Sequence, residues 1–196
     1  MSMAVGTIAL SCDGAAQGQW TPPPVTGYPV LQQPGAVPAG TVVPSRDLDT
    51  RSFLDRLHGY ALAFIDNGQY PARTVNGGKT WRVDGPVFHM NAAQGGGGVG
   101  QMGVPSHEAG VASDNTAYAW GGATPDRVVV VTTDGGKRWW GALFPGLVLF
   151  VGNTDGHLVA NVYGSVKQGH RTRTGLWAYS TKTGRQWTYS YSLGPQ

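Results

Sequence analysis

The chain has 196 residues, a formal net charge of +3 at pH 7, 13% charged residues and 31 glycines. Such sparse charge does not suit exposed helices, which favour Glu, Lys and Ala, whereas frequent glycine suits short strands joined by tight turns. The basic excess is too small to indicate a nucleic-acid-binding protein. The length allows one domain with a sizeable hydrophobic core.

Residues 1–20 form the first segment. The apolar run MSMAVGTIAL precedes Ser11 and Cys12, and it resembles the end of a lipoprotein signal with Cys12 as the acylated residue. This resemblance implies an extracytoplasmic protein (secreted, periplasmic or on the cell surface) that touches a membrane only through a lipid anchor at Cys12. Because Ala9 replaces the usual Leu and no basic residue precedes the run, a plain strand or ordered extension is the alternative. The single cysteine excludes an intrachain disulfide.

Residues 21–44 are rich in proline, glycine, valine and glutamine. The run of three prolines at positions 22–24 predicts extended polyproline-type chain. We expect this segment to be a linker that holds the following domain away from an anchor. The alternative is that residues 25–43 supply strands of a degenerate extra blade.

The remaining segment, residues 45–196, contains one short motif three times. Residues 74–81 read TVNGGKTW, residues 132–139 read TTDGGKRW, and residues 180–187 read STKTGRQW. An Asn or Asp side chain can bond to the backbone two residues on, and glycine supplies the positive φ that favoured hairpin turns need. The motif therefore predicts a tight hairpin with a tryptophan on the outgoing strand.

The repeat extends upstream of the hairpins, which indicates a repeated structural unit. The spacing from Tyr60 to Trp81 equals that from Tyr118 to Trp139, and GYALA at residues 59–63 aligns with AYAWG at 117–121. The third unit offers HLVANV at residues 157–162, followed by a longer insert. The three tryptophans recur at roughly 50-residue intervals, the length of one four-stranded propeller blade.

The motif resembles the Asp-box, or bacterial neuraminidase repeat, written Ser/Thr-x-Asp-x-Gly-x-Thr-Trp. The chain is similar to propellers of the photosystem II stability and assembly factor type and to sialidase-like propellers. This resemblance implies an all-β, β-propeller-like array of about three four-stranded blades, either a partial propeller or one completed by oligomerisation. In that family the boxes are structural. The structural positions carried over are Thr74, Asn76, Gly78, Trp81, Thr132, Asp134, Gly136, Trp139, Ser180, Gly184 and Trp187.

The resemblance to sialidases raises the question of catalysis. Glycoside hydrolysis generally needs two carboxylates, or a tyrosine nucleophile with a carboxylate, across the scissile bond. Glu108 is the only glutamate, and the aspartates beside turns have structural explanations. His89, His107 and Glu108 lack close metal-ligand spacing. We therefore expect no catalytic residue, no cofactor and no metal site.

Two features favour binding to other molecules. The insert at residues 165–174 carries Lys167, His170, Arg171 and Arg173 without an acid, so it either contacts an anionic partner or is a solvated loop. Three units are fewer than the four to eight blades of a typical propeller, and this predicts self-association or docking to a protein partner.

The sequence thus predicts a non-catalytic, extracytoplasmic binding or assembly module of a larger complex or cell surface. A glycan is a further candidate ligand. One alternative is a glycan-processing hydrolase of sialidase-like type. The other is a purely structural subunit of a multiprotein assembly.

Overall fold

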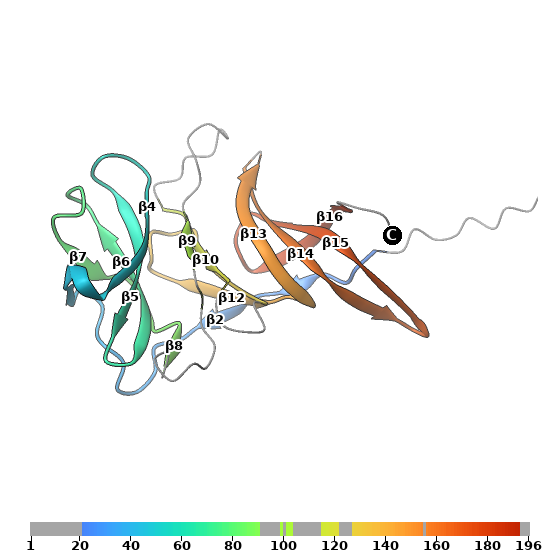
Figure 1. The fold of residues 1–196 in the computed structure, drawn as a ribbon, viewed down its shortest axis with the longest axis horizontal. Helices are drawn as coiled ribbons and strands as arrows, with labels where there is room; N and C mark the ends of the chain where they lie inside the picture. The colour runs from blue at the N-terminus through green and yellow to red at the C-terminus, as the bar shows by residue number, and fades with distance from the viewer. Residues whose placement is uncertain are drawn as a thin grey trace, which may run out of the picture.

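The computed structural model describes residues 21–90, 99, 101–103, 115–121, 127–154 and 156–192. In these residues the fold is all-β, as predicted, and consists of three antiparallel sheets that lie in a row (Figure 1). The only helical element described is a short 3-10 turn, Ser45–Asp47. None of the described helical structure is long and apolar enough to span a bilayer.

Each sheet contains four consecutive strands that pair antiparallel, plus one short strand from the N-terminal part of the chain. The first sheet has the order β3 (Val42–Val43), β7 (Trp81–Val83), β6 (Gly68–Thr74), β5 (Gly59–Ile65) and β4 (Leu48–Phe53), and β8 (His89–Met90) pairs with β6. The second has β2 (Tyr28–Val30), β12 (Trp139–Leu143), β11 (Val128–Thr132), β10 (Ala117–Trp120) and β9 (Gln101–Gly103). The third has β1 (Val25–Thr26), β16 (Gln186–Ser192), β15 (Arg171–Thr181), β14 (His157–Gln168) and β13 (Gly146–Thr154).

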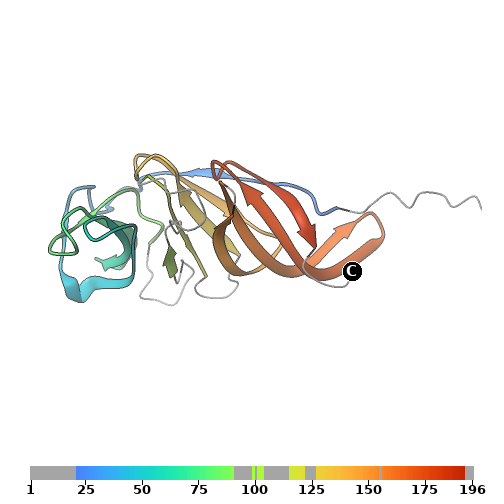
Figure 2. The ribbon, with the colours of Figure 1, turned by 90° about the horizontal axis from the view of Figure 1, so that it is seen from above.

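The N-terminal segment, residues 25–43, connects all three sheets. It adds β1 to the third sheet, β2 to the second and β3 to the first, so it crosses the sheets in the reverse of their chain order. Figure 2 shows this segment running along one side of the row. Pro29 is accommodated in β2 because an edge strand leaves one side without ladder hydrogen bonds. The segment predicted as a linker or a degenerate blade is thus distributed over three sheet edges.

Neighbouring sheets pack face to face. One face of the first sheet carries Tyr60 and Leu62, which join a buried cluster with Ala119 and Trp139 of the second sheet. The other face of the second sheet carries Tyr118 and Trp120, and these lie in a cluster with Trp187 of the third sheet. The hydrophobic core therefore consists of separate clusters, one at each junction between neighbouring sheets and one on the outer face of the first sheet.

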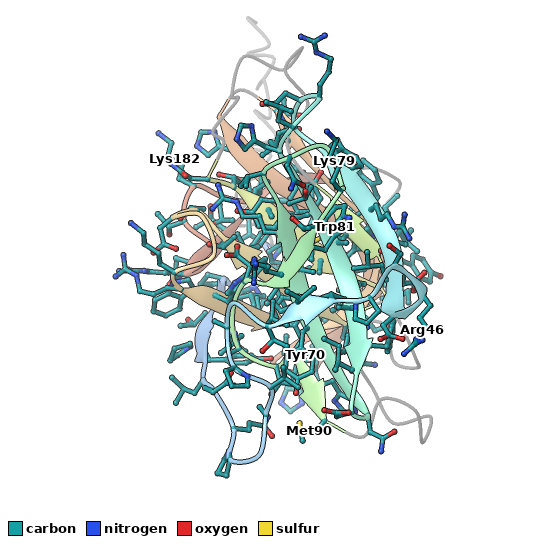
Figure 3. The ribbon with its side chains drawn as sticks, turned by 90° about the vertical axis from the view of Figure 1, so that its left-hand side faces the viewer. Arg46, Tyr70, Lys79, Trp81, Met90 and Lys182 are labelled. Carbon is teal, nitrogen blue, oxygen red and sulfur yellow. The ribbon has the colours of Figure 1, made fainter. Side chains whose placement is uncertain are left out.

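The outer face of the first sheet is covered by the chain's own N-terminal segment. Trp81 and Tyr70 on this face pack with Val43, Ala36 and Val37 of that segment. The backbone N–H of Val37 also donates a hydrogen bond of 3.0 Å to the hydroxyl of Tyr70. Figure 3 looks at this end of the molecule and labels Trp81 and Tyr70. This end of the row is capped.

The sequence predicted four-stranded blades, and each predicted unit corresponds to one antiparallel sheet. The sheets have an additional strand because the N-terminal segment pairs with the last strand of each unit. A row of three sheets is not a closed ring, so the propeller arrangement stays a prediction.

Candidate functional site

The first repeat turn, residues 74–81, is closed by its own side chains. The hydroxyl oxygen of Thr74 accepts hydrogen bonds from the backbone N–H groups of Gly78 (3.0 Å) and Asn76 (3.4 Å). The Asn76 side-chain oxygen accepts one from the backbone N–H of Thr80 at 3.0 Å. Gly77 and Gly78 have φ values of 69° and 80°, which glycine adopts without steric cost. The polar groups of this turn are therefore occupied in holding the hairpin.

The second repeat turn, residues 132–139, is closed by equivalent hydrogen bonds, and Asp134 takes the place of Asn76. The Thr132 hydroxyl accepts from the N–H of Gly136 at 3.0 Å, and Asp134 accepts from the backbone N–H of Arg138 at 2.9 Å and its Nε at 2.8 Å. Burial raises the pKa of Asp134, but the hydrogen bonds from Arg138 and Thr132 outweigh it and hold the pKa below its usual value. Asp134 is thus an ionised structural acid.

The third repeat turn is one residue shorter than the sequence alignment indicated. The hydroxyl that accepts the backbone N–H of Gly184, at 3.0 Å, belongs to Thr181 and not to Ser180. Thr181 also accepts from the N–H of Thr183 at 3.2 Å. Thr181 is buried like Thr74 and Thr132, whereas Ser180 is half-buried. An ungapped alignment missed this residue, and a one-residue gap before Trp187 would have found it.

The three repeat tryptophans, Trp81, Trp139 and Trp187, are all buried. The indole Nε1 of Trp139 donates a hydrogen bond of 3.1 Å to the backbone carbonyl of Asp84, which follows β7 of the first sheet. The Trp139 ring also meets Phe88 edge to face, with centroids 4.9 Å apart. Trp139 therefore ties the first sheet to the second.

A pocket of about 1020 Å³ lies beside this junction. Its walls come from three parts of the chain that are far apart in sequence: β2 with the segment that follows it, the loop after β7, and the second repeat turn with the start of β12. The lining residues are Pro29, Val30, Leu31, Gln32, Ala36, Pro38, Ala39, Asp84, Gly85, Pro86, Gly135, Gly136, Lys137, Arg138, Trp139 and Trp140. The volume is at the upper end of the range for small-molecule sites.

Asp84 is the only acid among the described lining residues. Burial raises the pKa of its carboxyl to about 6, although the charge of nearby Arg73 acts in the opposite direction. Its Oδ2 is buried and has no hydrogen-bond partner among the described residues. A Cβ on Gly136 would lie 2.1 Å from this oxygen, so the turn needs glycine here both for its φ of 86° and to leave room for the acid.

The residues predicted to contact an anionic partner lie elsewhere. Residues 165–174 form the outer end of the β14–β15 hairpin, which projects from the third sheet at the end opposite the first sheet (Figure 1). Lys167 and His170 are exposed, and Arg173 is half-buried. Arg171 lies in the same hairpin, at the start of β15. The structure thus places this cluster far from the pocket.

Other candidates from the sequence fall outside the described residues. Cys12, His107 and Glu108 are among these. His89 is half-buried in β8. Within the described part of the chain, no group of three His, Cys, Asp or Glu side chains is placed to hold a metal ion.

The pocket is a feature that sequence reasoning did not find, because its walls come from segments whose pairing is set only in three dimensions. Trp140, a tryptophan outside the repeat positions, is half-buried in the pocket wall. Comparison with known proteins adds no further assignment. No protein-family model matches the chain, and a search of curated proteins finds no significant match.

Proposed function

We propose that this protein is a non-catalytic, extracytoplasmic assembly module with a propeller-like array of Asp-box units, and that it self-associates through the outer face of its third sheet. The observation that carries this proposal is that the third sheet exposes a face whose counterparts in the first two sheets are buried. The extracytoplasmic location is supported by the lipoprotein-like segment that ends at Cys12. Cell fractionation of the native protein and of a Cys12→Ala variant tests this location.

The equivalence of the three faces follows from strand register. The buried threonine of each repeat turn pairs across the sheet with Gly59, Ala117 and Leu158, respectively. The residues that follow these partners, Tyr60, Tyr118 and Val159, point to the opposite face because side chains alternate along a strand. Tyr60 and Tyr118 are buried against the next sheet, whereas Val159 is half-buried.

The outer face of the third sheet carries several apolar side chains beside the polar residues Asn161 and Ser180. Leu147, Tyr163 and Leu176 are direct cross-strand neighbours on this face. The side chain of Tyr163 is 52% exposed, and Leu147 on β13 is also exposed. Contiguous apolar side chains of this kind mark interaction surfaces on soluble proteins.

The geometry favours a two-fold contact over an open chain of molecules. The first sheet is capped by residues 36–43, so the third sheet of one copy cannot continue onto the first sheet of another in the way that adjacent sheets pack within the chain. A two-fold contact uses the same patch on both copies and closes after two. We therefore expect a dimer that joins two third sheets.

Light scattering over a dilution series tests this proposal. The wild-type chain is expected to form a dimer, and Tyr163→Lys is expected to shift it to the monomer because each copy would bring a charge into the contact. Phe64→Lys is the matched control, since Phe64 is an exposed aromatic residue of the first sheet. A wild-type monomer at every concentration, or equal dissociation of both variants, would contradict self-association through this face.

A hydrolytic function has less support. Glycoside hydrolysis requires a pair of catalytic groups across the bond, and Asp84 is the only acid among the described residues that line the pocket. Asp134 is engaged in its turn by Arg138. A screen on sialosides and other glycosides, with Glu108→Gln as a control, distinguishes an enzyme from an assembly module.

A further inference from the structure

The pocket between the first and second sheets has walls that are formed before any ligand binds. Pro29, Pro38 and Pro86 contribute rings with little conformational freedom. The Trp139 indole is held by its hydrogen bond to the Asp84 carbonyl and by its edge-to-face contact with Phe88. A binding surface of this kind loses little conformational entropy when a ligand binds.

The charges of the pocket are unevenly distributed. Asp84 lies in the wall with its buried Oδ2 lacking a hydrogen-bond partner among the described residues. Lys137 and Arg138 also line the pocket, but both side chains are exposed, and the Arg138 guanidinium is engaged by Asp134 at 2.8 Å. Among the charged side chains that line the pocket, Asp84 is therefore the one that is partly buried, where the dielectric constant is lower than in water, and Arg73 of β6 is close enough to act on its charge.

Trp140 adds an aromatic surface that suits a cation. Its ring already carries the guanidinium of Arg185 at 4.6 Å from the ring centroid. Indole faces attract ammonium and guanidinium groups more strongly than the other aromatic side chains do. Because Arg185 already supplies a cation to this ring, Trp140 offers a ligand an aromatic surface for apolar contact, and Asp84 is the group that is complementary to a positive charge.

We propose that this pocket binds an organic ammonium ion, with the charged nitrogen at the Asp84 carboxylate and the apolar body against Trp140 and the prolines. An anionic ligand would bring like charge to Asp84, and a neutral ligand would forgo the charge-assisted hydrogen bond. The ammonium group belongs either to a free amine or to a lysine side chain of a peptide. This site goes beyond the assembly function and is separate from the third-sheet face.

The state of Asp84 makes binding dependent on pH. The titratable and charged groups near this carboxylate come from both sheets. Arg73 of β6 and Tyr60 of β5 belong to the first sheet, and the second repeat turn contributes Asp134, Lys137 and Arg138. Arg185 lies nearby on Trp140. Since burial raises the Asp84 pKa to about 6, lowering the pH below that value protonates the carboxyl and removes the charge that the ligand needs. The affinity for an ammonium ligand is therefore expected to fall as the pH is lowered from 7.5 to 5.

Three probes of similar shape test the proposal: 2-phenylethylammonium, neutral 2-phenylethanol and anionic 3-phenylpropionate. Binding is followed at pH 7.5 and pH 5 by calorimetry and by the NMR signals of the tryptophan indole N–H groups. The ammonium probe is expected to bind saturably at pH 7.5, at least about tenfold more tightly than the alcohol, and the anion more weakly than either. A short lysine peptide and its norleucine counterpart distinguish a peptide ligand from a free amine.

Variants locate the site. Asp84→Asn is expected to abolish both the preference for the ammonium probe and its pH dependence. Asp66→Asn is the matched control, because Asp66 is an exposed acid in the β5–β6 turn. Leu31→Lys provides an independent variant, since Leu31 lines the pocket and is 69% exposed, so we expect the fold to tolerate the change. It is expected to weaken binding of the ammonium probe more than binding of the alcohol.

The proposal is overturned if none of the probes binds saturably, or if the anion binds as well as the ammonium ion. It is also overturned if folded Asp84→Asn keeps the preference, or, should that variant fail to fold, if Leu31→Lys leaves the preference unchanged. These outcomes are independent of the oligomeric state, so failure here leaves the dimer proposal to its own test.

Discussion

The indole Nε1 of Trp139 lies 3.1 Å from the backbone carbonyl oxygen of Asp84, and this hydrogen bond joins the second repeat turn to the loop that leaves the first sheet. The same contact orders one wall of the pocket. It also accounts for Gly85, where an added Cβ would lie 2.4 Å from the Trp139 Nε1. One tryptophan therefore serves both the packing between sheets and the shape of the candidate site.

Trp139→Phe is expected to lower the free energy of unfolding by about 1–3 kcal/mol, because the partly buried Asp84 carbonyl loses its donor and the smaller ring leaves a cavity. Urea denaturation followed by circular dichroism measures the loss. Trp140→Phe is the matched control, since that indole is half-buried and makes no such bond among those described. Equal losses for the two variants would show that the hydrogen bond contributes little.

The one-residue shift in the third repeat turn predicts different effects at adjacent positions. Thr181→Val removes the hydroxyl that accepts the N–H groups of Gly184 and Thr183, and it is expected to destabilise the fold by about 1–2 kcal/mol. Ser180→Ala is expected to change stability by less than about 0.5 kcal/mol. Thermal unfolding of both variants shows which hydroxyl holds the turn. A larger loss of stability for Ser180→Ala than for Thr181→Val would support the ungapped alignment.

The cap on the first sheet can be tested with two adjacent valines in β3. Val43 is 4% exposed and packs with Trp81, whereas Val42 is 53% exposed. Val43→Asp is expected to destabilise the chain by about 3 kcal/mol or more, because it places a carboxylate in an apolar cluster. Val42→Asp is expected to be nearly neutral. Similar unfolding midpoints for the two variants would mean that the N-terminal segment is not packed on the first sheet in solution.

Asp84 gives a pH dependence of stability with a defined sign. Its pKa in the folded chain is raised to about 6, above the value of 3.8 for an unperturbed Asp, so the folded state holds the proton more tightly than the unfolded state. This contribution is fully present below pH 3.8 and is lost as the pH rises through about 6.

Melting temperatures measured from pH 4 to pH 7 test this linkage. Relative to Asp84→Asn, the wild-type chain is expected to lose stability as the pH rises over this window. Asp66→Asn should follow the wild-type curve, because Asp66 is exposed. Parallel curves for wild type and Asp84→Asn would show that the Asp84 carboxyl is not desolvated.

The all-β fold class could be predicted from the sequence because it depends on interactions between residues that are close in sequence. Glycine pairs such as Gly135-Gly136 adopt positive φ, and a threonine and an acid two residues apart close the turn between them. Short apolar runs, such as Val128–Thr132 before the second turn, then supply the strands. These interactions join residues that are close in sequence, so the local sequence is enough to predict them.

The pairing of strands that are far apart in sequence could not be predicted. No sequence pattern in the N-terminal segment predicts which strands it pairs with. In the structure, Val25 pairs with Trp187, Pro29 with Trp140 and Val43 with Trp81. Edge strands of two or three residues carry too little periodicity to specify a partner or a register. The chain itself defines the turns and the sheets they produce. The cap, the pocket around Asp84 and the partly exposed outer face of the third sheet arise only when distant segments are brought together by burial of their apolar side chains.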